Sequence, residues 1–164
     1  MSLDRFVRLD SSSPSSVLAE ERVPMAPWAH VALLSLIAWG VYAAFAGHGA
    51  VAAPLVVLAA WFLLASVRTV VTRDEVRIRL GVFGPTLPTA RIVSAEAIDG
   101  MSFLTLGWGI RFSLGGTITY SVPAFGRRYL RIAYTNDRGR PRVVRVMSLD
   151  PDALVRAIER ARAA

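Results

Sequence analysis

The feature that most constrains this chain is a long stretch without charge. Residues 23–67 contain no aspartate, glutamate, lysine or arginine, and their only basic side chains are two histidines. Two apolar runs, residues 26–46 and 50–67, lie on either side of Gly47-His48-Gly49. As helices at about 1.5 Å per residue they would extend roughly 31 and 27 Å, close to the roughly 30 Å of a bilayer core. The sequence therefore predicts two membrane-spanning helices joined by a tight turn.

The basic residues are concentrated after this predicted hairpin. The chain has no lysine, and residues 68–164 hold sixteen arginines against eight acidic residues. Arg68, Arg73, Arg77 and Arg79 follow the second run closely, and such a bias predicts that this end is cytoplasmic. We expect a multi-pass protein of the cell inner membrane with both termini in the cytoplasm. Cleavage of the first run as a signal peptide is disfavoured, because the run exceeds the usual apolar region of about 7–15 residues.

The chain divides into three predicted parts. Residues 1–23 include a serine-rich run without apolar periodicity and are expected to form a disordered tail. Residues 24–68 are the transmembrane hairpin, and residues 69–164 form a folded domain. That domain alternates apolar and polar residues in about seven short segments with glycine and proline between them, which predicts strands. The predicted strands are 69–72, 76–80, 90–98, 110–113, 117–120, 129–135 and 142–148.

A helix is predicted to follow the last strand. Asp150 is a favourable N-cap, Pro151 suits the first helical position, and an apolar stripe runs from Leu154 to Ala161. The expected fold class is α+β: a two-helix transmembrane hairpin, then a seven-stranded antiparallel β-sandwich or barrel, then a C-terminal capping helix.

This order of elements resembles the bacterial PH-like membrane proteins, in which two spanning helices precede a pleckstrin-homology-like domain. The resemblance rests on residues 71–76 (VTRDEV), 107–111 (GWGIR), 116–120 and 146–154, and spans about residues 28–163. It implies a PH-like fold and an anchored, adaptor-like role, but no reaction. In phosphoinositide-binding PH domains the loop between the first two strands is rich in basic residues. Here that loop is Arg73-Asp74-Glu75, so inositol-phosphate binding is not transferred to any residue.

The sequence offers little for catalysis. Cysteine and lysine are absent and both histidines lie in the apolar hairpin, so neither a nucleophile paired with histidine nor a phosphate-binding P-loop is present in the predicted domain. Asp150 and Asp152 are explained as helix caps and Asp137 as a turn residue. We therefore predict a protein that is not an enzyme and uses no metal or cofactor.

Two groups of residues are candidate contact sites. Arg127, Arg128, Arg131 and Arg145 lie on neighbouring predicted strands and would form a basic patch for anionic lipid or a partner, although such a patch also suits a merely solvated sheet face. Phe103, Leu104 and Trp108, with Phe125 from a second loop, are too apolar for free surface loops and are candidates for membrane contact. Core packing is the competing explanation for this second group.

The predicted function is a non-catalytic scaffold or regulatory module at the membrane. Its expected partners are membrane lipids and either another protein or a second copy of the chain, bound through a sheet edge. Nucleic acid is not expected, because no stacking platform accompanies the arginines. The alternative is an accessory subunit of a membrane transport or pore complex, for which Ser35 is nearly the only polar residue inside the hairpin.

Overall fold

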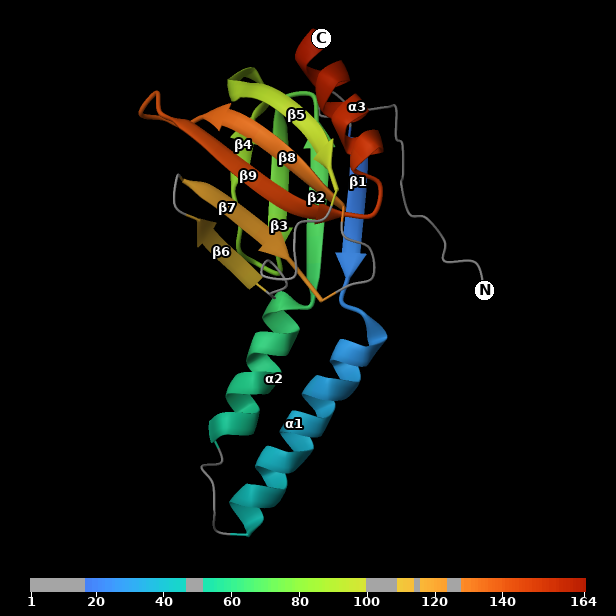
Figure 1. Cartoon of the computed structure of the whole chain (residues 1–164), viewed down its shortest axis with the longest axis vertical. Helices are drawn as coiled ribbons and strands as arrows, with labels where there is room; N and C mark the ends of the chain where they lie inside the picture. Colours follow the sequence, from blue (N-terminus) through green and yellow to red (C-terminus); the bar gives the residue numbers. More distant parts are fainter. Residues whose placement is uncertain (1–16, 47–51, 100–108, 114–115, 124–127) are drawn as a thin grey trace, which may run out of the picture.

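The computed structural model describes residues 17–46, 52–99, 109–113, 116–123 and 128–164. In these ranges the chain forms two β-sheets, a C-terminal helix and two apolar helices that project from one end of the sheets (Figure 1). The prediction of an α+β fold with a C-terminal helix on β-structure is confirmed. The strand count, one strand direction and the length of the second apolar helix differ from the prediction.

The first sheet is antiparallel and has the order β1-β2-β3-β4. The prediction of a disordered tail over residues 1–23 is wrong from Val17 onward, because this segment pairs with β2 along its length. Its apolar alternation is hidden in the sequence, since the inward position between Ala19 and Val23 is occupied by Glu21. The strands are β1 (Val17–Pro24), β2 (Ser66–Thr72), β3 (Glu75–Leu80) and β4 (Thr86–Pro88).

The second sheet has the order β5-β8-β9-β7-β6. The seven predicted strands correspond to β2, β3 and β5 to β9, so β1 and β4 are additional. The predicted all-antiparallel arrangement is wrong at one pair: β7 joins the free side of the β8–β9 hairpin and runs parallel to β9. A 3-10 turn, η1 (Thr89–Arg91), precedes this sheet. Its strands are β5 (Ile92–Ile98), β6 (Gly109–Ser113), β7 (Thr117–Ser121), β8 (Arg128–Thr135) and β9 (Pro141–Ser148).

A single apolar core draws on both sheets and on the C-terminal helix α3 (Pro151–Ala163). Leu154, Ala157 and Ile158 of α3 are at most 2% exposed and complete the core that the strands begin. The predicted N-cap is confirmed, because the Asp150 carboxylate accepts a hydrogen bond of 3.1 Å from the backbone N–H of Ala153. The amphipathic helix α3 thus buries its apolar stripe against the sheets, as expected for a surface helix.

The hairpin consists of α1 (Pro27–Phe45) and α2 (Ala52–Leu64), which lie side by side (Figure 1). Only α1 is long and apolar enough to cross a membrane by length and composition, among the described residues. The prediction of two such helices is wrong for α2, which at 13 residues extends about 20 Å. It ends early because Val67, predicted to be helical, instead pairs with Val23 and Leu80 in the first sheet.

Two contacts fix the packing of the helix pair. The indole Nε1 of Trp61 donates a hydrogen bond of 2.9 Å to Nδ1 of His30. Farther from the sheets, Gly40 of α1 faces Pro54 of α2, and a Cβ added at Gly40 would lie 3.4 Å from Cδ of Pro54, an ordinary van der Waals contact.

Candidate functional site

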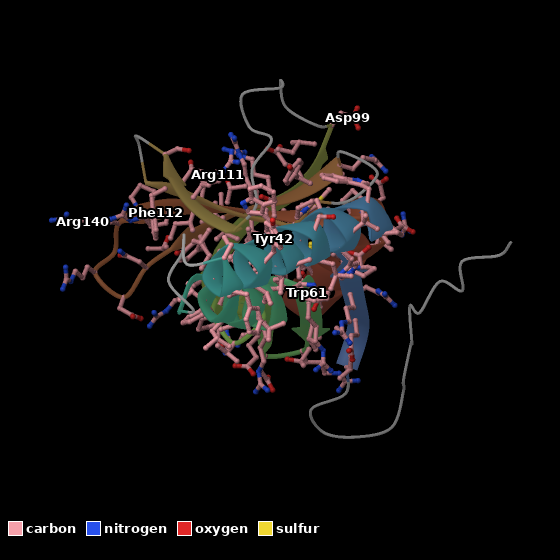
Figure 2. The ribbon with its side chains drawn as sticks, turned by 90° about the horizontal axis from the view of Figure 1, so that it is seen from below. Tyr42, Trp61, Asp99, Arg111, Phe112 and Arg140 are labelled. Atoms are coloured by element: carbon pink, nitrogen blue, oxygen red, sulfur yellow. The ribbon has the colours of Figure 1, made fainter. Side chains whose placement is uncertain are left out.

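The surface of the helix pair is apolar and largely uncovered. Ala29 is the one buried residue of α1, whereas Trp39 is 69% exposed and Phe45 is 89% exposed. Figure 2 views the pair from below, with Tyr42 and Trp61 near the middle of the projection. An apolar surface of this extent is unfavourable in water and is typical of a membrane or protein contact.

Three arginines form a line across the outer face of the first sheet. Arg22 of β1 lies opposite Arg68 of β2, which in turn lies opposite Arg79 of β3. Their side chains point away from the core, because the adjacent residues on each strand are buried. We call these three residues the arginine row. It lies two residues from the Pro24–Ser66 pair, where both helices join the sheet.

The arginine row has an excess of positive charge. Arg68 forms an ion pair with Glu20, with 2.7 Å between Nη2 and Oε1. Arg22 donates from Nε to the Ser66 hydroxyl at 3.3 Å, and Arg79 donates to carbonyl oxygens and a threonine hydroxyl around the β3–β4 turn. Like charges directly opposite each other destabilise a sheet. With one paired carboxylate for three guanidinium groups in the described residues, the row attracts anions.

A groove with a volume of about 1170 Å³ lies beside the arginine row, between α2 and the β1–β2 pair. One wall is apolar and comes from α2, whereas the other is polar and comes from the two strands. The apolar wall consists of Leu55, Leu58, Ala59 and Trp61, and the polar wall includes Glu20, Arg22, Ser66 and Arg68. The groove therefore changes from apolar to cationic along the direction that leads from the helices to the sheet.

A buried carboxylate joins β1 to the end of the domain. Glu21 is 6% exposed and points into the core side of the first sheet. Its Oε2 accepts a hydrogen bond of 2.6 Å from the hydroxyl of Ser148, and its Oε1 accepts from the backbone N–H groups of Leu149 and Asp150 at 2.8 and 3.0 Å. The negative charge thus lies at the N-terminal end of α3, where the helix dipole favours it.

The predicted basic patch is brought together only in part. Arg131 of β8 lies directly opposite Arg145 of β9, as the alternation predicts. Arg131 also forms an ion pair with Glu96 of β5, so its charge is compensated within the sheet. The function assigned to this patch stays a prediction.

Arg128 lies on the other side of β8 from Arg131, because the two positions differ in parity. It pairs with Asp152 of α3 at 2.7 Å and with Asp99 at 3.2 Å. The hydrogen bond to Asp152 raises the pKa of the Arg128 guanidinium. This arginine therefore ties β8 to α3 and is not part of a continuous patch, while Arg127 lies outside the described residues.

The predicted membrane-contact loop also lies outside the described residues. This applies to Phe103, Leu104, Trp108 and Phe125 alike. Two residues near it in sequence are described on β6: Phe112 is 79% exposed and Arg111 is half-buried. Figure 2 places both to one side of the helix pair.

Sequence reasoning missed the arginine row as a site. Arg68 and Arg79 contributed only to the orientation of the hairpin, and Arg22 fell in the segment expected to be disordered. The detectable signal was the alternation Val76 to Leu80, which places Arg77 and Arg79 on one face. Nothing in the sequence alone predicted that Arg22 pairs with Arg68.

The described residues contain no group of three or more histidine, cysteine, aspartate or glutamate side chains that could bind a metal ion. The groove holds one carboxylate, that of Glu20, and it is occupied by Arg68. The arrangement of this site suits binding of an anion or an amphiphile.

Comparison with models of protein families, with curated proteins and with solved structures gives no match to this chain.

Proposed function

We propose that this protein is a non-catalytic interaction module that is anchored in a membrane by its helical hairpin. The observation that carries the proposal is the apolar, exposed surface of α1 and α2 next to the arginine row. Apolar helices in contact with lipid followed by arginines at the headgroup level form the pattern of an anchored domain. The predicted PH-like character of the domain belongs to this proposal, supported by two sheets followed by a helix that packs on them.

The pairing of β1 with β2 supports the predicted topology. Strand β1 precedes α1 and strand β2 follows α2, yet the two pair over seven residue positions. Under this proposal both ends of the helix pair lie on the same side of the membrane, although only α1 is long enough to cross it. The excess of arginine in the domain favours the cytoplasmic side of the inner membrane. Removal of α1 by a signal peptidase would also detach β1 and Glu21, which argues against the signal-peptide alternative.

The interaction surface in this proposal is the outer edge of β6. Among the described residues, strand β6 ends the second sheet and pairs with β7 alone. Phe112 on this edge is 79% exposed. An exposed edge with an aromatic side chain fits the addition of a strand from a partner protein or a second copy. The transport-subunit alternative gains no support, because the hydroxyl of Ser35 donates to the carbonyl of Val31 within its own helix.

The chain lacks cysteine, which allows a direct test with single engineered cysteines. Asp137→Cys places a thiol on an exposed turn of the domain, and Phe45→Cys places one at the far end of α1. We expect the protein to resist alkaline carbonate extraction from membranes. We also expect a membrane-impermeant maleimide to label position 137 in inside-out vesicles and not in intact spheroplasts. Extraction of the protein into the aqueous phase at alkaline pH would overturn the proposal.

A further inference from the structure

The groove between α2 and the β1–β2 pair has two walls of opposite character. Leu55 and Leu58 on the α2 wall are 61% and 46% exposed, although they are large aliphatic side chains. Arg22 and Arg68 form the cationic part of the other wall. A ligand that satisfies both walls must carry an anionic group at one end and a hydrocarbon chain at the other.

We propose that the groove binds one anionic phospholipid, with its phosphodiester group between Arg22 and Arg68 and an acyl chain along α2. This inference rests on the proposed membrane insertion of the hairpin and names a ligand for it. Along α2, from Leu55 to the end of the helix at Leu64, the groove extends about 14 Å, at about 1.5 Å per residue. That length accommodates a glycerol backbone and the upper part of an acyl chain.

The charges explain why the phosphate group binds between these two side chains. Arg22 and Arg68 are directly opposed across the strand pair, at which Cβ atoms lie about 5 Å apart. In the described residues Arg22 makes no ion pair, and the one carboxylate nearby, that of Glu20, pairs with Arg68. A phosphate oxygen that accepts hydrogen bonds from both guanidinium groups relieves their repulsion, and guanidinium groups bind phosphate in a fixed, bidentate geometry.

The position of the groove favours a lipid over a soluble phosphate. The arginines lie two residues beyond the Pro24–Ser66 pair, where the helices leave the sheet. This is the depth at which headgroup phosphates meet a domain whose apolar helices are in the bilayer. A free phosphate ion would use the arginines alone and would leave the wall of Leu55, Leu58 and Ala59 in water.

Trp61 lies in the apolar wall and provides a local reporter. Replacement of Trp28, Trp39 and Trp108 by phenylalanine leaves it as the one indole in the full chain. This protein is reconstituted into phosphatidylcholine vesicles that contain either brominated phosphatidylglycerol or brominated phosphatidylcholine at equal mole fraction. We expect stronger quenching of Trp61 by the brominated anionic lipid, and the ratio of quenching gives the relative binding constant.

The arginines are tested with two variants of equal charge. Arg22→Gln combined with Arg68→Gln changes the groove, whereas Arg156→Gln combined with Arg162→Gln changes α3, which packs on the sheets away from the helix pair (Figure 1). A surface arginine contributes about fivefold to binding of anionic lipid, so the groove variant should lower the preference roughly 5- to 30-fold. The α3 variant should retain it. An equal loss in both variants, or no loss in either, would overturn the inference.

A second pair of variants tests the apolar wall. Ala59→Phe fills the groove, and Val56→Phe adds the same side chain on α2 at a position that is 65% exposed and outside the groove. Loss of the lipid preference with Ala59→Phe alone supports a bound lipid, and its retention contradicts one. Abolition of the preference by added inorganic phosphate would identify a phosphate site instead. Absence of quenching by both lipids would show that the hairpin is not in the bilayer, which refutes the proposed function itself.

Discussion

Replacement of Glu21 tests whether β1 is an integral part of the domain. In Glu21→Ala the hydroxyl of Ser148 and the N–H groups of Leu149 and Asp150 lose their acceptor. The Glu21 residue that supplies this acceptor is only 6% exposed. A buried polar group left without a partner costs about 1–3 kcal/mol. Allowing for water that enters the space, we expect a loss of about 3–6 kcal/mol in the free energy of unfolding, a large part of the roughly 5–15 kcal/mol of a typical domain.

Two companion variants sharpen this test. Glu21→Gln keeps an oxygen for the two backbone donors and offers an N–H to the Ser148 hydroxyl, so it should lose only about 1–2 kcal/mol. Glu20→Ala removes the neighbouring carboxylate from its exposed ion pair with Arg68 and should cost at most about 1 kcal/mol. Urea unfolding of the full chain in detergent, followed by near-ultraviolet circular dichroism, measures all three. Equal stability of Glu21→Ala and Glu20→Ala would refute the assignment of Glu21 as a buried acceptor.

Three further predictions concern single contacts. Asp150→Ala should lower the free energy of unfolding by about 1 kcal/mol in the same urea assay, because the first turn of α3 loses its cap. Burial raises the pKa of the Tyr120 phenol, so unfolding should become easier as the pH rises above about 10, where the unfolded chain ionises first. Tyr120→Phe should flatten that dependence in alkaline thermal melts, and an unchanged slope would count against it. Trp61→Phe removes the indole hydrogen bond to His30 and should weaken the helix pair by about 0.6–1.7 kcal/mol in detergent unfolding, whereas no change would show that the contact is not formed.

Local signals predicted most of the strands and the last helix. Asp137 was interpreted as a turn residue, and the side chain of the preceding Asn136 accepts hydrogen bonds from the N–H groups of Arg138 and Arg140 in that turn. Asp150 acts as the predicted cap. These features depend on residues close in sequence, which is why composition and spacing suffice to find them.

The remaining differences arise from contacts between distant residues. Strand β1 depends on pairing with β2 across the whole hairpin and on a carboxylate that binds groups more than 120 positions away. The end of α2 is set by the pairing of Val67 with Leu80, although Val67 is as apolar as the helix before it. The parallel β7–β9 pair likewise has no local signal. The candidate groove requires β1, β2 and α2 together, and because β1 was not predicted, the groove could not be predicted either.

The insertion of both helices between β1 and β2 has a consequence for biosynthesis. The N-terminal strand leaves the ribosome first, but its neighbour β2 emerges only after the helix pair, and the donors for Glu21 lie near residue 150. The early segment must therefore stay unpaired until nearly the whole domain has been synthesised. Contacts of such long sequence separation form slowly. Deletion of residues 17–24 would therefore remove the outer strand of the first sheet and leave β2 without its neighbour.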